Sequence, residues 1–200
     1  MGRRTSQDTV KDGVPLRDLY ETPSEVTTAF LNVFGNAIQE LGVIYCPCNG
    51  KGALSRVLES YSIDHNKSWV FILKDLYTED GDREDFLNAP IYAYDILIEN
   101  PPWGKNVAPF LIKAYNSKKP FAFLLSTEVL SYKRTNRILT KNGAIIYFIV
   151  PRPDFIHEGR HVQVGGCMWV IGNYRDVDGL HVGGTMDLKG DDQEDADEEV

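Results

Sequence analysis

The feature that most constrains the fold is a regular alternation of short apolar runs with stretches of helical periodicity. The apolar runs, each suited to a buried strand, are 43–45, 69–73, 94–98, 121–125, 144–150 and 165–172. Helical patterns precede or separate them at 23–41, from residue 53 onward, at 107–115 and at 132–140. Strands that alternate with helices favour parallel pairing, because each crossover helix returns the chain to the same edge. The sequence therefore predicts an α/β protein with a doubly wound sheet.

The segment around Thr22 predicts the start of the first helix. Thr22 is expected to cap it, with Pro23 as the first helical residue and Glu25 completing a Thr-x-x-Glu capping box. Apolar residues at helical spacing then continue as far as Leu41. We expect this helix to pack on the sheet.

The turn Asn100-Pro101-Pro102-Trp103 follows the apolar run 94–98 and is expected at the end of a buried strand. Such a turn suits methyl transfer to a conjugated amino nitrogen, because the Asn100 side-chain oxygen and the Pro101 carbonyl can accept both hydrogens of an NH2 group. Trp103 can stack on the ring, and two prolines fix the carbonyl directions without adding a donor. The alternative is an ordinary strand-ending turn, since Asn and Pro are common there for conformational reasons.

A second informative segment is the loop 46–52, Cys-Pro-Cys-Asn-Gly-Lys-Gly, which lies between the run 43–45 and a helix expected from Ala53. Its glycines let the backbone approach a ligand closely, and the helix N-terminus offers free N–H groups to an anion. The loop lacks the third glycine of a dinucleotide fingerprint and the Lys-Ser/Thr pair of a Walker loop. It is therefore a candidate ligand loop of another class.

Four features occur here in one order: the Thr-Pro segment at Thr22, the loop 46–52, the pair Asp85-Phe86, and the turn 100–103. In this order they resemble the S-adenosylmethionine-dependent methyltransferases of amino groups, in particular the gamma-type N6-adenine DNA methyltransferases. The resemblance spans about Thr22 to Arg152. It implies a Rossmann-like methyltransferase sheet, mostly parallel with an antiparallel last strand, S-adenosyl-L-methionine as cofactor, and methylation of adenine N6 in DNA.

The resemblance also implies a set of site residues, with no metal among the cofactors. The cofactor's methionine part would lie along the loop, Thr22 would help close its pocket, and Asp75 would bind the ribose hydroxyls. Asp85 would accept the adenine amino group, with Phe86 as an apolar wall. The implied catalytic residues are Asn100, Pro101, Pro102 and Trp103, and the implied cofactor-binding residues are Thr22, Cys46, Asn49, Gly50, Gly52, Asp75, Asp85 and Phe86.

One position departs from the family pattern and keeps other functions open. The family usually has an acid immediately before the loop proline, where this chain has Cys46, so the methionine ammonium needs another partner. A methyltransferase-like nucleic-acid-binding module without cofactor affinity is therefore an alternative. Enzymes with this turn also methylate amino groups in RNA bases and in protein glutamine, so these acceptors are alternatives to DNA.

The charge of the chain is unevenly distributed. The formal net charge is -8, and residues 182–200 hold eight acids against Lys189 alone, which leaves the preceding chain nearly neutral. Acid-rich segments of this kind are expected to stay solvated and disordered. We therefore expect a disordered acidic tail at 182–200. The resemblance implies a methyltransferase domain at 19–181, and we expect a flexible N-terminal arm at 1–18 before it.

Basic residues gather after the Asn-Pro-Pro turn and allow a basic face beside the site for a nucleic-acid partner. They are Lys118, Lys119, Lys133, Arg134, Arg137, Lys141, Arg152 and Arg160. An ordinary solvated surface is the alternative. The resemblance of the Thr-Pro segment and the motif order to DNA enzymes puts DNA before RNA. The odd number of cysteines indicates reduced thiols. We find no leader pattern and no long apolar span, so we expect no membrane crossing. The expected location is cytoplasmic or nuclear, in the host cytoplasm if viral, and the protein is not expected to be secreted. Cys-x-Cys is not the usual spacing of a zinc site, so no metal is expected.

Overall fold

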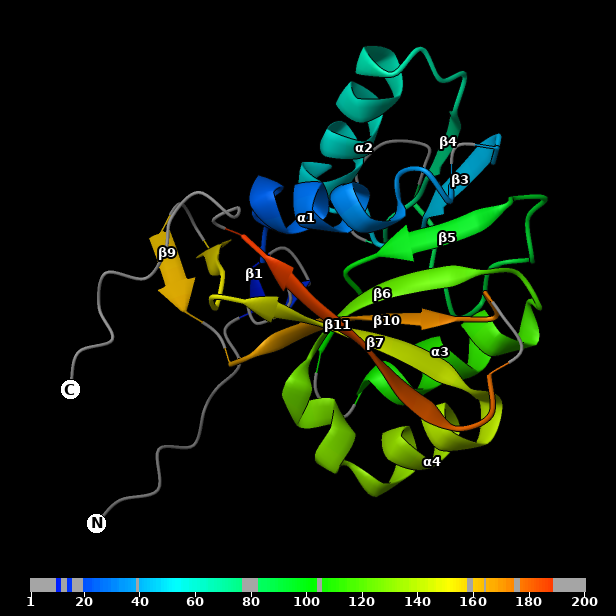
Figure 1. Cartoon of the computed structure of the whole chain (residues 1–200). Coiled ribbons are helices and arrows are strands. Elements are labelled where there is room, and N and C mark those ends of the chain that lie inside the picture. Colours follow the sequence, from blue (N-terminus) through cyan, green and yellow to red (C-terminus); the bar gives the residue numbers. More distant parts are fainter. Residues whose placement is uncertain are drawn as a thin grey trace.

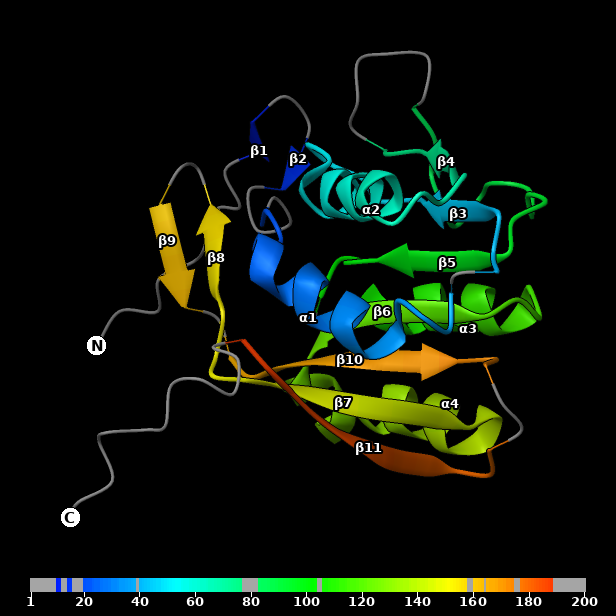
Figure 2. The same cartoon turned by 45° about the horizontal axis from the view of Figure 1, so that its top comes forward.

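The architecture is organised around a mixed β-sheet, seen obliquely between its helices in Figure 1 and with its strands side by side in Figure 2. The computed structural model describes residues 10–11, 14–15, 20–38, 40–76, 83–103, 106–157, 160–163, 165–174 and 177–188. Within these residues the main sheet has seven strands in the order β11-β7-β10-β6-β5-β3-β4. Its strands are β3 (Val43–Cys46), β4 (Val70–Leu73), β5 (Ile96–Glu99), β6 (Phe121–Ser126), β7 (Ala144–Val150), β10 (Cys167–Gly172) and β11 (Leu180–Asp187).

All neighbouring strands of this sheet pair in parallel except those that involve β10. The strand β10 runs antiparallel to both β6 and β7, with Trp169 opposite Leu124 on one side and Tyr147 on the other. The predicted α/β class with a mostly parallel sheet and a reversed strand is therefore confirmed. The reversed strand is not the last in the chain, however, because β11 follows it and pairs in parallel with β7.

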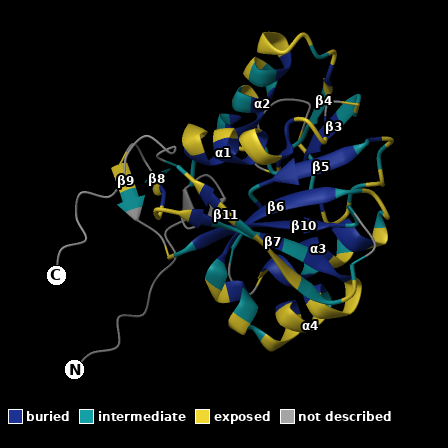
Figure 3. Ribbon diagram, viewed as in Figure 1, coloured by how far each residue is buried: buried dark blue, intermediate teal, exposed yellow. Residues whose placement is uncertain are grey.

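Four helices cover the two faces of the sheet. They are α1 (Ser24–Phe34), α2 (Ala53–Asp64), α3 (Val107–Asn116) and α4 (Lys133–Asn142), and the 3-10 helix η3 (Thr127–Ser131) precedes α4. Figure 1 shows α1 and α2 on one face and α3 and α4 on the other. Because both faces are covered, β5, β6 and β10 are buried at every position, as the dark strands of Figure 3 show.

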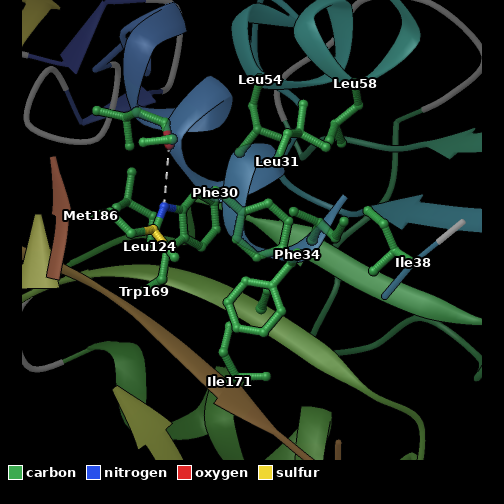
Figure 4. Packing of buried hydrophobic residues seen from close by; sticks show 14 of the residues in the cluster. Phe30, Leu31, Phe34, Ile38, Leu54, Leu58, Leu124, Trp169, Ile171 and Met186 are labelled. Carbon is green, nitrogen blue, oxygen red and sulfur yellow. Dashed lines mark hydrogen bonds between the residues drawn. The ribbon is translucent and has the colours of Figure 1, made fainter. Parts of the chain in front are cut away.

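The cluster beneath α1 anchors that helix to the sheet, as Figure 4 shows. The ring centroids of Phe30 and Trp169 lie 4.6 Å apart, and the Trp169 indole N–H donates to the Val26 carbonyl at 3.4 Å. Phe34 packs edge-on against Tyr147, at 5.1 Å between ring centroids. The helix that carries the Thr22 segment is therefore fixed to the centre of the sheet, and it holds Thr22 over the sheet's carboxyl edge.

The start of α1 corrects the predicted capping box. The N-cap is Pro23, its side chain makes no capping hydrogen bond, and helix geometry begins at Ser24. Thr22 instead accepts a hydrogen bond from the Asn100 side chain at 3.1 Å. A contact between residues distant in the chain thus replaces the local cap.

The predicted domain boundaries also need correction at the C-terminal side. Residues 182–187, assigned to the acidic tail, belong to β11, so the sheet continues past residue 181. The rest of the predicted tail, 189–200, lies outside the described residues. In the predicted N-terminal arm, β1 (Val10–Lys11) and β2 (Val14–Pro15) form a short antiparallel ladder, and the other residues before Tyr20 lie outside the described part.

A small hairpin stands apart from the main sheet. It consists of β8 (Asp154–His157) and β9 (Arg160–Gln163), paired antiparallel. Its backbone also contacts the segment before α1, because the Glu21 amide donates to the Ile156 carbonyl at 2.9 Å. None of the helices in the described ranges combines the length and the apolar character needed to cross a membrane.

Candidate active site

The sheet topology brings the two sequence motifs together. The strands β3 and β5 are neighbours, while the connections that follow them lead to β4 on one side and to β6 on the other. Strand order reverses at this point, and in open α/β sheets ligands bind beyond the carboxyl ends of the strands at such a switch point. The loop 46–52 follows β3 and the turn 100–103 follows β5, so both lie at the carboxyl ends of these neighbouring strands (Figure 2).

A cavity occupies this crevice and is lined by most of the predicted site residues. Ten of the twelve predicted residues line it: Thr22, Asn49, Gly50, Asp75, Asp85, Phe86, Asn100, Pro101, Pro102 and Trp103. The other two, Cys46 and Gly52, lie behind the lining and are buried. The sequence motifs therefore converge on one site although they lie tens of residues apart.

The side chain of Asn100 is held in a defined orientation. Its Nδ2 donates to the Thr22 hydroxyl at 3.1 Å, which turns Oδ1 away from that contact. Among the described residues, Oδ1 is buried and has no hydrogen-bond partner. A buried acceptor without a donor is unfavourable in a folded protein, and at a cavity wall it marks a place for a ligand donor.

Trp103 is fixed by contacts with β6 and with the hairpin. Its indole N–H donates to the Leu124 carbonyl at 3.0 Å, and its ring packs edge-on against Phe155 at 5.2 Å between centroids. Phe155 belongs to the hairpin, so this small element supports the turn 100–103, which we call the acceptor turn. The tryptophan is only partly buried and lines the cavity, so part of its surface faces a ligand.

The glycine loop is shaped by left-handed glycines and by carboxylates that accept its amides. Gly50 and Gly52 have φ values of 51° and 75°, which glycine adopts without the penalty of a side chain. The Gly50 amide donates to Asp75 Oδ2 at 2.7 Å. In the same loop the Asn49 side-chain oxygen is buried without a partner among the described residues. The loop thus contains a second acceptor without a partner among the described residues.

The pair Asp85-Phe86 also lines the cavity. Asp85 accepts the Leu87 amide at 2.9 Å and also bonds the Asn88 side-chain amide, so it caps the turn that follows. Phe86 is buried and stacks on Phe110 at 5.4 Å between centroids, which makes it an apolar wall.

The neighbouring Glu84 was not predicted as a site residue, yet it lines the cavity. Its carboxylate accepts from the Tyr45 hydroxyl at 3.4 Å and from the Tyr92 hydroxyl. It is therefore a second acid on this wall, and two tyrosines hold it in place.

Sequence analysis also missed Glu99, the last residue of β5, which lines the cavity although only 2% of its surface is exposed. Its carboxylate accepts the Cys48 amide and the Asn100 amide, both at 2.8 Å. Burial raises the pKa of Glu99 to about 7, against the lowering effect of these two bonds. An acid at the end of an apolar strand, directly before the Asn-Pro-Pro turn, was the signal that could have revealed it.

The cavity as a whole is acidic. Five carboxylates line it: Glu21, Asp75, Glu84, Asp85 and Glu99. Lys51 is the only lysine or arginine in the lining formed by the described residues, and it is paired with Glu21 at 2.7 Å. A cavity of this charge favours a cationic ligand and disfavours phosphate. No group of side chains suited to hold a metal ion is present in the described part of the chain.

No protein-family model matches the sequence, and no curated protein sequence matches it. Solved structures do match the fold. One is a Pyrococcus horikoshii protein described as an RNA methyltransferase, with a TM-score of 0.62 and 14% identity, covering 82% of this chain and 89% of that one. Another is a Listeria monocytogenes protein described as a class I S-adenosylmethionine-dependent methyltransferase, with a TM-score of 0.59 and 13% identity, covering 84% of this chain and 66% of that one.

A third match is the methyltransferase subunit of a type I restriction-modification system from Streptococcus thermophilus. It has a TM-score of 0.56 and 15% identity and covers 77% of this chain. The present chain spans only 44% of that subunit. The architecture built above, with its reversed strand between β6 and β7, is therefore the Rossmann-like fold of S-adenosylmethionine-dependent methyltransferases.

Proposed function

We propose that the protein is an S-adenosylmethionine-dependent methyltransferase that acts on an exocyclic amino group, with adenine N6 in DNA as the first acceptor to test. The observation that carries this proposal is the Asn100 side chain. Its Nδ2 is fixed by Thr22, and its Oδ1 is a buried acceptor at the cavity wall without a partner in the described residues. An amino group has the donors that this oxygen lacks.

The chemistry follows from the acceptors that surround the incoming nitrogen. Asn100 Oδ1 and the Pro101 carbonyl each take one N–H, which withdraws the nitrogen lone pair from conjugation and directs it toward the cofactor side of the cavity. The bound cofactor supplies a methyl group on a positively charged sulfur. The new N–C bond would form as the S–CH3 bond breaks, with the bonding pair left on sulfur as a neutral thioether. The two acceptors would stabilise the positive charge on nitrogen until one N–H proton leaves to solvent. Trp103 holds the ring by stacking.

The residues of the cavity fit the proposed cofactor. S-adenosylmethionine carries a sulfonium and an ammonium, and the lining offers five carboxylates against one lysine that is already paired. The unpartnered Asn49 oxygen adds an acceptor in the glycine loop. Phe86, stacked on Phe110, gives a flat apolar wall suited to the adenine ring. The fit comes from charge and from hydrogen-bonding capacity together.

Nucleic acid is the acceptor class that we favour. An acidic cavity repels phosphate, so only a base turned out of the strand would enter, while the backbone stays on the outer surface. Exposed cations for such a backbone are present at the start of α4, at Lys133 and Arg134. The restriction-modification subunit and the RNA methyltransferase among the similar folds support nucleic acid in general, and the motif order supports DNA.

Part of the basic face predicted from the sequence lies elsewhere. Lys118 and Lys119 precede β6, and Lys141 lies at the end of α4 just before β7, so all three are at the amino edge of the parallel strands. The site is at the opposite, carboxyl edge. Only the cations near the start of α4 and those beyond β7, at Arg152 and Arg160, lie on the side of the cavity.

The decisive experiment offers the protein a methyl donor labelled on the methyl group together with separate pools of DNA, RNA and protein. We expect label in the DNA pool, in N6-methyladenine after digestion. Asn100→Ala should remove the incorporation, whereas Asn106→Ala should keep it, because Asn106 is exposed and its side chain makes no capping bond. Label confined to RNA or to glutamine amides would move the acceptor to those alternatives and leave the reaction type in place.

The binding-module alternative predicts no cofactor affinity. Thermal unfolding with and without S-adenosylmethionine separates the two, because a ligand at about a hundred times its dissociation constant adds roughly 2.7 kcal/mol of stability. No change of the unfolding temperature at saturating donor, with no label in any pool, would leave the module as the better description.

A further inference from the structure

Glu99 is a buried carboxylate that faces the cavity without a cation beside it. Only 2% of its surface is exposed, and no lysine or arginine of the described residues pairs with it. Removing a carboxylate from water is costly unless a positive charge or several hydrogen bonds compensate it. Two backbone amides supply part of that compensation, from Cys48 and from Asn100. The rest has to come from a ligand or from a proton.

The position of Glu99 links the two halves of the site. One oxygen accepts an amide of the glycine loop and the other accepts the first amide of the acceptor turn. Each oxygen keeps a further lone pair. The carboxylate therefore lies where the cofactor loop and the acceptor turn meet, and it retains accepting capacity on the cavity side.

The charge of the same carboxylate acts on the Cys46 thiol of the neighbouring strand. Burial, and then the charge of Glu99, raise the pKa of that thiol well above its ordinary value, so Cys46 stays neutral. A second carboxylate at position 46 would repel that of Glu99. The acid Glu99 on β5 is thus compatible with a neutral residue, Cys46, on β3.

We propose that Glu99 binds the methionine ammonium of S-adenosylmethionine, and so supplies from β5 the carboxylate that Cys46 cannot supply from β3. The ammonium is the cation of that cofactor with hydrogens to donate, whereas the sulfonium has none, so a carboxylate with free lone pairs suits the ammonium. This inference rests on the proposed function and names the residue that makes its cofactor site complete.

Protonation gives the inference a measurable signature. The titratable groups that face Glu99 are Asp75, Cys46 and Cys48, and none of them carries a positive charge. The free protein therefore holds a proton on Glu99 up to about neutral pH, where its pKa is about 7. An ammonium binds the ionised form, so binding releases that proton. Cofactor affinity should rise with pH below this value and level off above it.

The experiment measures dissociation constants by calorimetry from pH 5.5 to 8.5 for three probes. S-adenosylmethionine and S-adenosylhomocysteine both carry the ammonium, and methylthioadenosine lacks it. In Glu99→Gln we expect about tenfold or greater weakening of the first two probes, unchanged binding of methylthioadenosine, and no rise of affinity with pH. Glu99→Asp, which keeps the charge, should restore part of the affinity. The matched control is Glu128→Gln, which removes an exposed acid outside the cavity lining and should change nothing.

Three results would overturn the inference. Equal affinity and an equal pH profile in wild type and Glu99→Gln would remove Glu99 from ammonium binding. Equal weakening of methylthioadenosine would show that Glu99 only shapes the loop. If the variant does not fold, a flat wild-type pH profile for S-adenosylhomocysteine would reject the inference, and a profile that rises only for the probes with the ammonium would support it. Failure of all three probes to bind wild type would instead reject the proposed function itself.

Discussion

The two loops that meet at the cavity are stabilised in different ways. The acceptor turn 100–103 is held by groups from distant parts of the chain: the Thr22 hydroxyl, the Leu124 carbonyl and the Phe155 ring. The glycine loop 46–52 is held by its own amides, which donate to the carboxylates of Asp75 and Glu99. The side chains of the turn are therefore held by neutral groups, and only its Asn100 amide donates to Glu99, whereas the loop depends on the carboxylates of two acids. Chemistry and cofactor capture should respond differently to mutation and to pH.

The sharpest separation of the two loops is expected from Asn100→Ala. The change removes the oxygen that accepts the amino group, and loss of one such preorganised group lowers kcat by about a hundredfold to a thousandfold. The glycine loop is untouched, so affinity for S-adenosylmethionine should not change. Single-turnover rates and calorimetry on the same preparation measure both quantities. A variant with normal turnover would remove Asn100 from the mechanism.

The second test concerns the stability of the glycine loop against pH. The pKa of Glu99 is about 7 in the folded protein against an ordinary value of 4.5, so between these values the folded state holds a proton that the unfolded state has lost. The free energy of unfolding should therefore fall as pH rises from about 4.5 to about 7, by at most about 3 kcal/mol, and level off above. Glu99→Gln should remove this part of the fall. Urea unfolding of both proteins across that range measures the difference, and identical slopes would contradict the assignment.

A smaller effect is expected from Thr22→Val, which keeps the shape of the side chain but removes the acceptor for Asn100 Nδ2. The amide then rotates more freely, and kcat should fall by about tenfold because the accepting oxygen is no longer aligned. Cofactor affinity should be unaffected if Thr22 acts through the turn. Thr22→Ser keeps the hydroxyl and should retain activity. A change in cofactor affinity with constant kcat would instead support the role first predicted for Thr22, in closing the cofactor pocket.

The smallest effect is expected outside both loops, on α4. Replacing Lys133 and Arg134 by alanine should weaken nucleic-acid binding several-fold and reduce the slope of log affinity against log salt by about 2. Lys118 and Lys119, at the other edge of the sheet, are the matched pair and should leave the slope unchanged. Binding isotherms at several salt concentrations decide between the two pairs. Equal effects of both would mean that the cations act only through net charge.

The sequence was sufficient to predict the buried strands and to predict that the loop 46–52 and the turn 100–103 lie close together. Runs such as 121–125 and 144–150 are apolar at successive positions because helices cover both faces of the sheet, and such runs can be recognised without a structure. Parallel strands bring their carboxyl ends to one edge, so motifs that follow β3 and β5 had to converge. Whether these residues carry out the proposed roles stays a prediction.

The features that were missed depend on contacts or on mixed local signals. Thr22 had a good local capping pattern, but its hydroxyl accepts a hydrogen bond from Asn100, which lies 78 positions further along the chain. The strand β11 contains Gly183 and Gly184 and is interrupted by a bulge, so its short sequence looked like part of the acidic tail. Glu99 was not predicted as a site residue because a charged residue is rarely expected inside a buried strand.

The edge strand β11 has a practical consequence for anyone who shortens the chain. Trimming at residue 181, where the acidic composition suggests a boundary, would strip the hydrogen-bonding partners from β7 along Ile146 to Val150. An unpaired apolar edge recruits other chains and promotes aggregation. A version that ends after Leu188, whose amide still donates to the Val150 carbonyl at 2.8 Å, would keep that edge closed.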